Sequence, residues 1–263
     1  MAKAATELLI AFGAKVYAID RNDIDLPVYK SIKGDLSTRE GIDSVVSELP
    51  EKIDALFMCH GVALIPEKEK FIQLVNFIGQ KYMVEALLPR ISENGSVSFI
   101  SSSGGYGWEN KIELINEYIN LNTFEEQVEW VEGHMPIFSE GYMSDSYCFS
   151  KQCINAYVKS KVRSPEFINK KIRVNAIAPS YTISGLTKDF NLAISQDGSE
   201  ESGEKLMHDL FLKSWNGRPG TSEDMGYPLV MIGSNLFGYL SGQVIYIDFG
   251  MTGEMDYKNL LSK

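Results

Sequence analysis

The sequence has few of the residues that mark metal, redox and disulfide-rich proteins. Its 263 residues include only three cysteines and three histidines. Cys59, Cys148 and Cys153 have spacings that match neither a zinc site nor a redox pair. No His-Glu-x-x-His pattern is present either. We therefore expect reduced, structural cysteines and no metal centre.

Long apolar runs and clusters of basic residues are also missing. No run approaches the roughly 18 apolar residues of a membrane-spanning helix, and Glu7 interrupts the apolar start of the chain. Against 35 Asp and Glu there are only 25 Lys and Arg, so the formal net charge is −10. Such a surface repels phosphate backbones and anionic lipids. The sequence predicts a cytoplasmic protein that binds neither nucleic acid nor a membrane.

What the chain does contain is enough apolar material for a core, arranged as alternating strands and helices. Hydrophobic residues make up 44% and charged residues 23%. Short β-branched runs predict strands at 15–20, 31–36, 54–59, 96–101, 172–178 and 243–248. Helical periods lie at 2–12, 38–49, 70–88, 146–163 and 222–231. This alternation predicts an α/β fold with a doubly wound parallel sheet, in one domain over residues 1–263.

Two stretches depart from the alternation. Residues 106–141 have isoleucines at helical spacing and seven Glu against one Lys between Glu109 and Glu132, which predicts an inserted acidic helix pair. Residues 184–217 begin polar and then recover a helical pattern, which is typical of a substrate lid.

Asp20 closes a predicted strand. In dinucleotide-binding sheets, a carboxylate at that position accepts hydrogen bonds from the adenosine ribose. The alternative is a turn residue. If Asp20 binds the ribose, its charge repels a 2′-phosphate and favours NAD over NADP, although the neighbouring Arg21 weakens that preference.

Three tyrosines have a lysine four residues later, in the pairs Tyr29/Lys33, Tyr147/Lys151 and Tyr157/Lys161. On a helix, this spacing lets the ammonium lower the pKa of the phenol and make it a general acid/base. The first pair enters a strand, so the helix argument does not apply to it. The third pair is turned roughly 80° from the second on the same helix. Tyr147 is the better candidate, because Ser102 and neighbouring hydroxyls end the preceding strand, where ligands bind in open sheets.

These features, in this order, resemble short-chain dehydrogenase/reductases over nearly the whole length. The resembling segments are 54–61, 75–79, 100–102, Tyr147 with Lys151, 173–179, 216–220 and 241–248. Three positions depart from the family pattern: Cys59-His60-Gly61 replaces Asn-Ala-Gly, Ser180 replaces a usual glycine, and Phe249 replaces the first glycine of a Gly-Gly pair. Within the family, the chain is most similar to bacterial 3α-hydroxysteroid dehydrogenase/carbonyl reductases.

The resemblance implies a Rossmann-like fold and a nicotinamide cofactor, NAD by the Asp20 argument. It implies catalysis by Tyr147 as acid/base, Ser102 as donor to the substrate oxygen, Lys151 as partner of the phenol and nicotinamide ribose, and Asn76 as the residue that positions a water. The implied cofactor-binding residues are Asp20, Arg21, Asp35, Leu36, Cys59, Gly61, Tyr147, Lys151, Pro179 and Thr182. The implied substrate is an alcohol or ketone on a steroid-like or other bulky apolar skeleton, and the implied assembly is a homo-oligomer. Tyr106, Trp108, Tyr142, Tyr181 and Phe190 line its pocket or belong to the core.

A glycine-rich phosphate turn is absent, because the chain opens directly in a helix. The start resembles sequence that follows such a turn in the family. We therefore expect a first strand and a glycine turn, roughly 12 to 20 residues, to precede Met1. Two alternatives remain: a non-catalytic remnant acting as an interaction or scaffold protein, and a sugar or polyol dehydrogenase.

Overall fold

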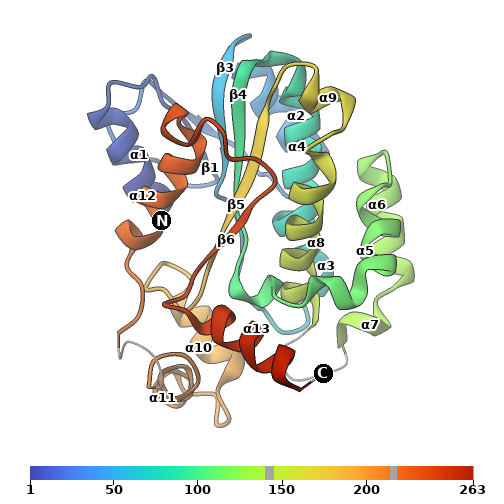
Figure 1. Ribbon diagram of the computed structural model, residues 1–263, viewed down its shortest axis with the longest axis vertical. Coiled ribbons are helices and arrows are strands. Elements are labelled where there is room, and N and C mark those ends of the chain that lie inside the picture. Colours follow the sequence, from blue (N-terminus) through green and yellow to red (C-terminus); the bar gives the residue numbers. More distant parts are fainter. Residues whose placement is uncertain (140–144, 214–217, 263) are drawn as a thin grey trace.

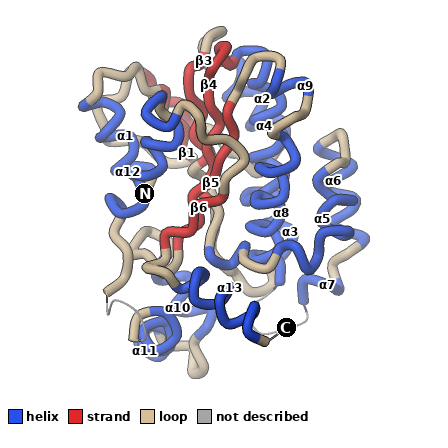
Figure 2. Tube along the Cα trace, in the orientation of Figure 1, coloured by secondary structure: helices blue, strands red, loops and turns tan. Residues whose placement is uncertain are grey.

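The computed structural model describes residues 1–139, 145–213 and 218–262, and its strands form two parallel sheets. In the smaller sheet, β1 (Tyr17–Asp20) pairs with β2 (Lys30–Lys33). The larger sheet has the order β3 (Ile53–Met58), β4 (Ile91–Ile100), β5 (Arg173–Pro179) and β6 (Val244–Ile247). All six predicted strands are confirmed, and the α/β, Rossmann-like fold class with them (Figure 2).

The helices that cover the sheets are α1 (Ala2–Ala11), α2 (Arg39–Glu48), α3 (Glu69–Gln73), α4 (Gly79–Leu87), α8 (Asp145–Lys161), α9 (Pro165–Ile168) and α12 (Ser222–Gly233). Figure 1 shows α1 and α12 on one side of the larger sheet and α4 and α8 on the other. Side chains alternate between these layers along β4, because successive residues of a strand point to opposite faces. Val97 and Phe99 join the core on the α8 side, whereas Ile100 joins the core under α12.

β1 and β3 are each unpaired on their second side among the described residues. Burial differs accordingly: residues 95–100 of β4 are all buried, whereas the residues of β1 are only half-buried or exposed. The described strands thus form two sheets, as expected for a doubly wound sheet whose central first strand is absent from the described residues. The further strand expected before Met1 stays a prediction.

A separate helical layer lies against α8. It comprises α5 (Ile112–Ile119), α6 (Phe124–Gly133) and α7 (Pro136–Ser139). Aromatic rings join it to α8: the Tyr118 ring stacks on Trp130 at 4.5 Å and on Phe149 at 5.8 Å between centroids. The stretch 106–141 thus contains helices as expected, although residues 140–141 lie outside the described part.

Three more helices complete the fold: α10 (Thr187–Ile194), α11 (Glu200–Phe211) and α13 (Met251–Leu261). α10 and α11 lie in the stretch predicted as a lid, of which residues 214–217 are outside the described part. α13 was not expected from the sequence. It begins where the Asp248 carboxylate accepts hydrogen bonds from the backbone N–H groups of Gly250 (2.9 Å) and Thr252 (2.8 Å). No helix within the described residues has the length and apolar character needed to cross a bilayer.

Candidate active site

Ser102, Tyr147 and Lys151 meet at the carboxyl end of β4. Ser102 follows that strand, and α8 carries the other two residues. The Ser102 hydroxyl is close enough to the Tyr147 phenol to influence its pKa. The Lys151 Nζ lies 5.7 Å from the centroid of the Tyr147 ring and donates a 3.0 Å hydrogen bond to the carbonyl of Ile100. A hydroxyl, a phenol and an ammonium are thus held together on two rigid elements.

The protonation of this cluster differs from the sequence expectation. Burial raises the pKa of Tyr147 above its ordinary value, and the nearby Ser102 hydroxyl opposes this only in part. Burial also lowers the pKa of Lys151 to about 8. The expected fall of the Tyr147 pKa toward neutrality is therefore not found in this arrangement, because desolvation of the phenol outweighs the stabilising effect of an ammonium whose hydrogen bond goes to a carbonyl.

Strand alternation and close helix packing select Ser102 over its neighbour. The Ser101 hydroxyl points inward and donates to Asn155 Oδ1 at 2.6 Å. Asn155 in turn donates to the carbonyl of Gly105 at 2.9 Å. A Cβ on Gly105 would lie 2.6 Å from Asn155 Nδ2, so only glycine fits there. Asn155, which sequence reasoning missed, therefore fixes the segment that presents Ser102.

Asn76 lies on a π-helical turn, Leu74–Ile78, between α3 and α4. Such turns occur frequently at functional sites. Its amide bonds both backbone groups of Val62, accepting from N–H at 2.8 Å and donating to C=O at 3.1 Å, and it also donates to Ser150 Oγ at 3.3 Å. A Cβ on Gly61 would lie 3.3 Å from Asn76 Oδ1 and 3.7 Å from Lys151 Nζ. Asn76 thus fixes the position of the turn after β3, next to Lys151. That Asn76 positions a water molecule stays a prediction.

His60, in the same turn, was not predicted as a site residue. Its Nε2 is buried without a hydrogen-bond partner among the described residues. Burial and the charge of Lys151 lower its pKa to about 4, so the imidazole is neutral at physiological pH. Gln80 donates to the His60 carbonyl at 2.6 Å. Only the departure from Asn-Ala-Gly distinguished this position in the sequence.

The residues expected to hold the adenosine end follow β1 and β2. Asp20 is exposed, and its Oδ1 accepts from the backbone and side chain of Asn22 at 2.8 and 3.2 Å. Hydrogen bonds from Ser37 lower the pKa of Asp35, and the charge of Arg21 contributes, which places Arg21 near Asp35. Leu36 is buried in the core. These residues share one edge of the smaller sheet.

The remaining predicted cofactor residues follow β3 and β5. Burial raises the pKa of the Cys59 thiol to about 12, and the Met1 ammonium is close enough to oppose this in part. Pro179 ends β5, and Thr182 is buried with its hydroxyl donating to the Ser180 carbonyl at 2.9 Å. The amino end of α1 therefore lies at the carboxyl end of β3, beside the catalytic cluster.

The five aromatic residues considered for a pocket have separate roles. Phe190 contacts Tyr147 edge to face, with centroids 5.1 Å apart. The Tyr106 hydroxyl donates to Asp256 on α13 at 2.7 Å, and Trp108 packs against the main core. Tyr181 donates to Asn191 Oδ1 at 3.4 Å. Tyr142 lies outside the described residues.

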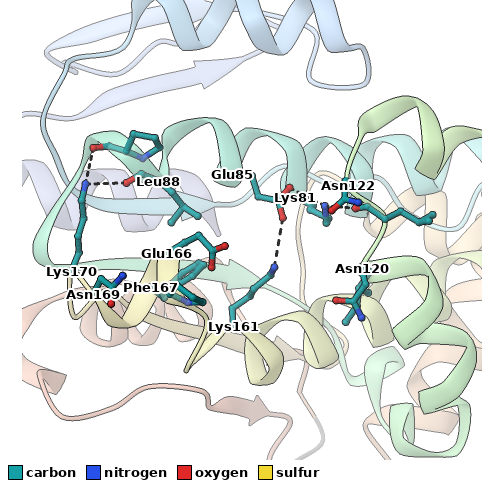
Figure 3. Close-up of a pocket in the computed structure, with 14 residues that line it drawn as sticks. Lys81, Glu85, Leu88, Asn120, Asn122, Lys161, Glu166, Phe167, Asn169 and Lys170 are labelled. Atoms are coloured by element: carbon teal, nitrogen blue, oxygen red, sulfur yellow. Dashed lines mark hydrogen bonds and ion pairs between the residues drawn. The ribbon is translucent and has the colours of Figure 1, made fainter.

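A cavity of about 600 Å³ lies elsewhere, where α4 and α8 end (Figure 3). It contains the lysine of the third Tyr-x-x-x-Lys pair. The Lys161 Nζ lies 3.8 Å from a Glu85 carboxylate oxygen, and the Tyr157 hydroxyl bonds the same carboxylate at 3.4 Å. Tyr157 is fully buried core. Tyr157 and Lys161 therefore interact with Glu85 and lie apart from the group formed by Ser102, Tyr147 and Lys151.

Comparison with known proteins relates the chain to dehydrogenases and reductases. Residues 138–252 match the family described as Enoyl-(Acyl carrier protein) reductase. A coniferyl-alcohol dehydrogenase of Pseudomonas sp. (strain HR199 / DSM 7063) is 27% identical over 245 residues, covering 93% of this chain and 89% of the relative. The chain is similar to short-chain dehydrogenase/reductases.

Solved structures of the family share this fold. A 3-alpha-hydroxysteroid dehydrogenase from Pseudomonas sp. B-0831, complexed with NADH, has a TM-score of 0.78 at 19% identity, covering 97% of this chain and 94% of that one. A gluconate 5-dehydrogenase assigned to Beutenbergia cavernae, with bound NADP, has a TM-score of 0.59 at 19% identity, covering 85% and 77%. Family members are nicotinamide-dependent oxidoreductases acting on alcohol groups, and this chain is an oxidoreductase of that class.

The residues present fit the nicotinamide end of such a cofactor. A Cβ on Gly61 would lie 3.3 Å from Asn76 Oδ1, so glycine keeps this turn open beside Lys151, and His60 Nε2 in the same turn is buried without a hydrogen-bond partner among the described residues. At the phosphate end, the described residues include the start of α1 but no glycine-rich turn. Among the described residues, those near Lys151 therefore suit the nicotinamide of the cofactor, whereas only the start of α1 is available for its phosphates.

Proposed function

We propose that the chain interconverts an alcohol and its carbonyl compound with NAD, using Tyr147 as the general acid/base. The observation that supports this most is the grouping of Ser102, Tyr147 and Lys151 at the carboxyl end of β4, with the Lys151 Nζ 5.7 Å from the centroid of the Tyr147 ring. The cofactor supplies or accepts the hydride. Tyr147 gives a proton to the substrate oxygen during reduction and takes it back during oxidation, while Ser102 donates a hydrogen bond to that oxygen.

We further propose an apolar substrate on a bulky skeleton, for which steroid ketones are one test class and polyols the contrast. Phe190, beside Tyr147, offers an apolar surface. NADH-dependent reduction of a panel of ketones, with NADH binding followed separately by fluorescence, tests the proposal. A folded protein that neither binds NADH nor reduces any ketone would contradict it and favour the scaffold alternative.

The pH dependence of reduction is expected to follow Lys151. Its lowered pKa of about 8 means that the ammonium is present below pH 8 and lost above it. The ammonium stabilises negative charge on the phenolate that forms as Tyr147 gives up its proton. We therefore expect kcat/KM for ketone reduction to fall above about pH 8. Tyr147 and His60 titrate outside this range, above and below it respectively.

A variant sharpens this prediction. Lys151→Arg keeps its charge at all working pH values, so the fall should move upward in pH, even where the absolute rate drops. Lys159→Arg, on the exposed part of the same helix, should leave the profile unchanged. A fall near pH 8 that persists in Lys151→Arg would assign it to another group.

Cofactor choice is expected to depend on Asp20. Its Oδ1 accepts hydrogen bonds from Asn22, and the carboxylate is exposed to solvent at the end of β1. Removing a charge that faces a 2′-phosphate changes affinity by about fivefold at an exposed site. Asp20→Ser should therefore lower the ratio of the Kd for NADPH to that for NADH by about that factor. Asp23→Ser, three residues on, should not change the ratio.

We propose that a second copy of the chain covers the exposed apolar side chains around β6. The outer face of α8 is already covered by the α5–α6 layer within the chain. Large apolar side chains are instead exposed on both sides of β6, at Leu236, Tyr239, Phe249, Tyr257 and Leu260. β6 is also an edge strand. Large exposed apolar side chains near an edge strand are typical of an interface between subunits.

The oligomer is tested by light scattering after size exclusion. The expected mass is a multiple of 29.4 kDa. The double variant Tyr239→Asp with Leu260→Asp should have the mass of a single chain. Phe12→Asp, exposed on α1 away from this edge, serves as the control. A monomeric unmodified protein at micromolar concentration would contradict the proposal.

A further inference from the structure

Phe190 is the aromatic side chain that the structure places on the ring of Tyr147. The two rings meet at 83° with centroids 5.1 Å apart, an edge-to-face contact. Lys151 covers the same tyrosine ring at 5.7 Å. An ammonium offers no surface for an apolar substituent. Of these two neighbours, Phe190 is therefore the one that can pack against the carbon skeleton of a substrate.

The position of Phe190 is set by hydrogen bonds at the start of α10. The backbone N–H of Ser184 donates to Thr187 Oγ1 at 2.8 Å, and that hydroxyl lies 3.4 Å from the Thr182 carbonyl. These bonds tie the first turn of α10 to the segment that follows β5. Phe190 lies three residues after Thr187, on the same face of the helix. The position of its ring is therefore fixed by the attachment of α10 to the segment after β5.

The rest of the α10–α11 unit packs chiefly on itself. A Cβ on Gly203 would lie 1.8 Å from the Asn191 carbonyl oxygen, so the helices approach as closely as glycine allows. Asn191 is buried and accepts from Tyr181 at 3.4 Å. The unit thus behaves as a stiff support, and Phe190 is the residue through which it reaches the catalytic tyrosine.

A substrate oxygen that bonds Tyr147 and Ser102 brings the substituents of its carbon beside this contact. An aromatic ring can take up the edge-to-face geometry that Phe190 already makes, whereas a saturated ring gains only contact area. We propose that Phe190 is a specificity-determining residue that selects alcohols and ketones with an aromatic ring next to the reacting carbon. This inference rests on the proposed function and narrows its substrate class.

The test compares two secondary alcohols of matched shape, 1-phenylethanol and 1-cyclohexylethanol. Phe190→Leu keeps apolar bulk but removes the ring. Its kcat/KM should fall by about two- to tenfold on the phenyl substrate and change little on the cyclohexyl one. Phe190→Tyr keeps the ring and should preserve the preference. Leu192→Ala, half-exposed on the same helix, is the matched control.

Binding separates this inference from the proposed function. The Kd of acetophenone and of cyclohexyl methyl ketone is measured with NAD and without cofactor, conditions that allow no turnover. Weaker binding of acetophenone alone to Phe190→Leu supports the inference, even if every variant lacks activity and the proposed function fails. Equal losses for both ketones, or no loss for either, would overturn the inference while leaving NAD-dependent catalysis intact.

Discussion

Tyr147→Phe is expected to lower kcat for ketone reduction by about 10²-fold or more, because general acid/base groups contribute that much to a proton transfer. The variant removes only the hydroxyl near Ser102 and keeps the ring that contacts Phe190. Binding of NADH, followed by fluorescence, should be nearly unchanged. The measurement is steady-state reduction at pH 7, below the loss of the Lys151 charge.

The chain provides a matched control on the same helix. Tyr157 also has a lysine four residues later, but its hydroxyl bonds Glu85 at 3.4 Å in the core. Tyr157→Phe should therefore retain kcat per folded molecule, whatever it does to stability. Equal losses of kcat in both variants would mean that Tyr147 has no special role in catalysis. Full activity of Tyr147→Phe would remove the acid/base assignment.

The agreement between sequence and structure is greatest where a local pattern decides. Strand periods predicted the six strands, and helix geometry showed that Tyr147 and Tyr157 cannot face the same site. The 80° rotation places Tyr157 in the core beside Phe99, as the 5.9 Å ring contact shows. Tyr147 was preferred because hydroxyl side chains end the preceding strand, where ligands bind in open sheets, and Ser102 itself was implied by the family resemblance.

What the sequence could not provide depends on residues far apart in it. Asn155 acts on Gly105, and Asn76 on Val62, across separations that no periodicity encodes. The pKa of Tyr147 depends on how much water the assembled protein excludes, which a Tyr-x-x-x-Lys spacing does not report.

Arg173 provides the second large effect, on stability. Its guanidinium, at the start of β5, is 7% exposed and donates to four backbone carbonyls where α12 ends. The acceptors are Ile232 at 2.7 Å, Gly233 at 3.3 Å, Ser234 at 3.0 Å and Phe237 at 3.3 Å. The last carbonyls of a helix lack partners within it and carry its negative dipole end. One cation thus satisfies a buried helix terminus.

Arg173→Met leaves those carbonyls buried without a donor, so the free energy of unfolding should fall by about 3 kcal/mol. Urea denaturation followed by circular dichroism measures this. Arg173→Lys should recover only part of the loss, because one ammonium cannot reproduce the planar fork that spans four acceptors. Arg163→Met, exposed after α8, should change stability by less than about 0.5 kcal/mol.

The effect of Arg173 on catalysis is expected to be indirect. α12 packs on β4 and β5 and also holds α1, since a Cβ on Gly226 would lie 2.8 Å from the backbone nitrogen of Ala5. Loosening α12 therefore loosens α1, which begins beside Cys59 near the catalytic cluster. Ketone reduction by Arg173→Met should keep its kcat at low temperature and lose activity several degrees earlier on heating. A lowered kcat with an unchanged urea midpoint would instead place Arg173 in the reaction itself.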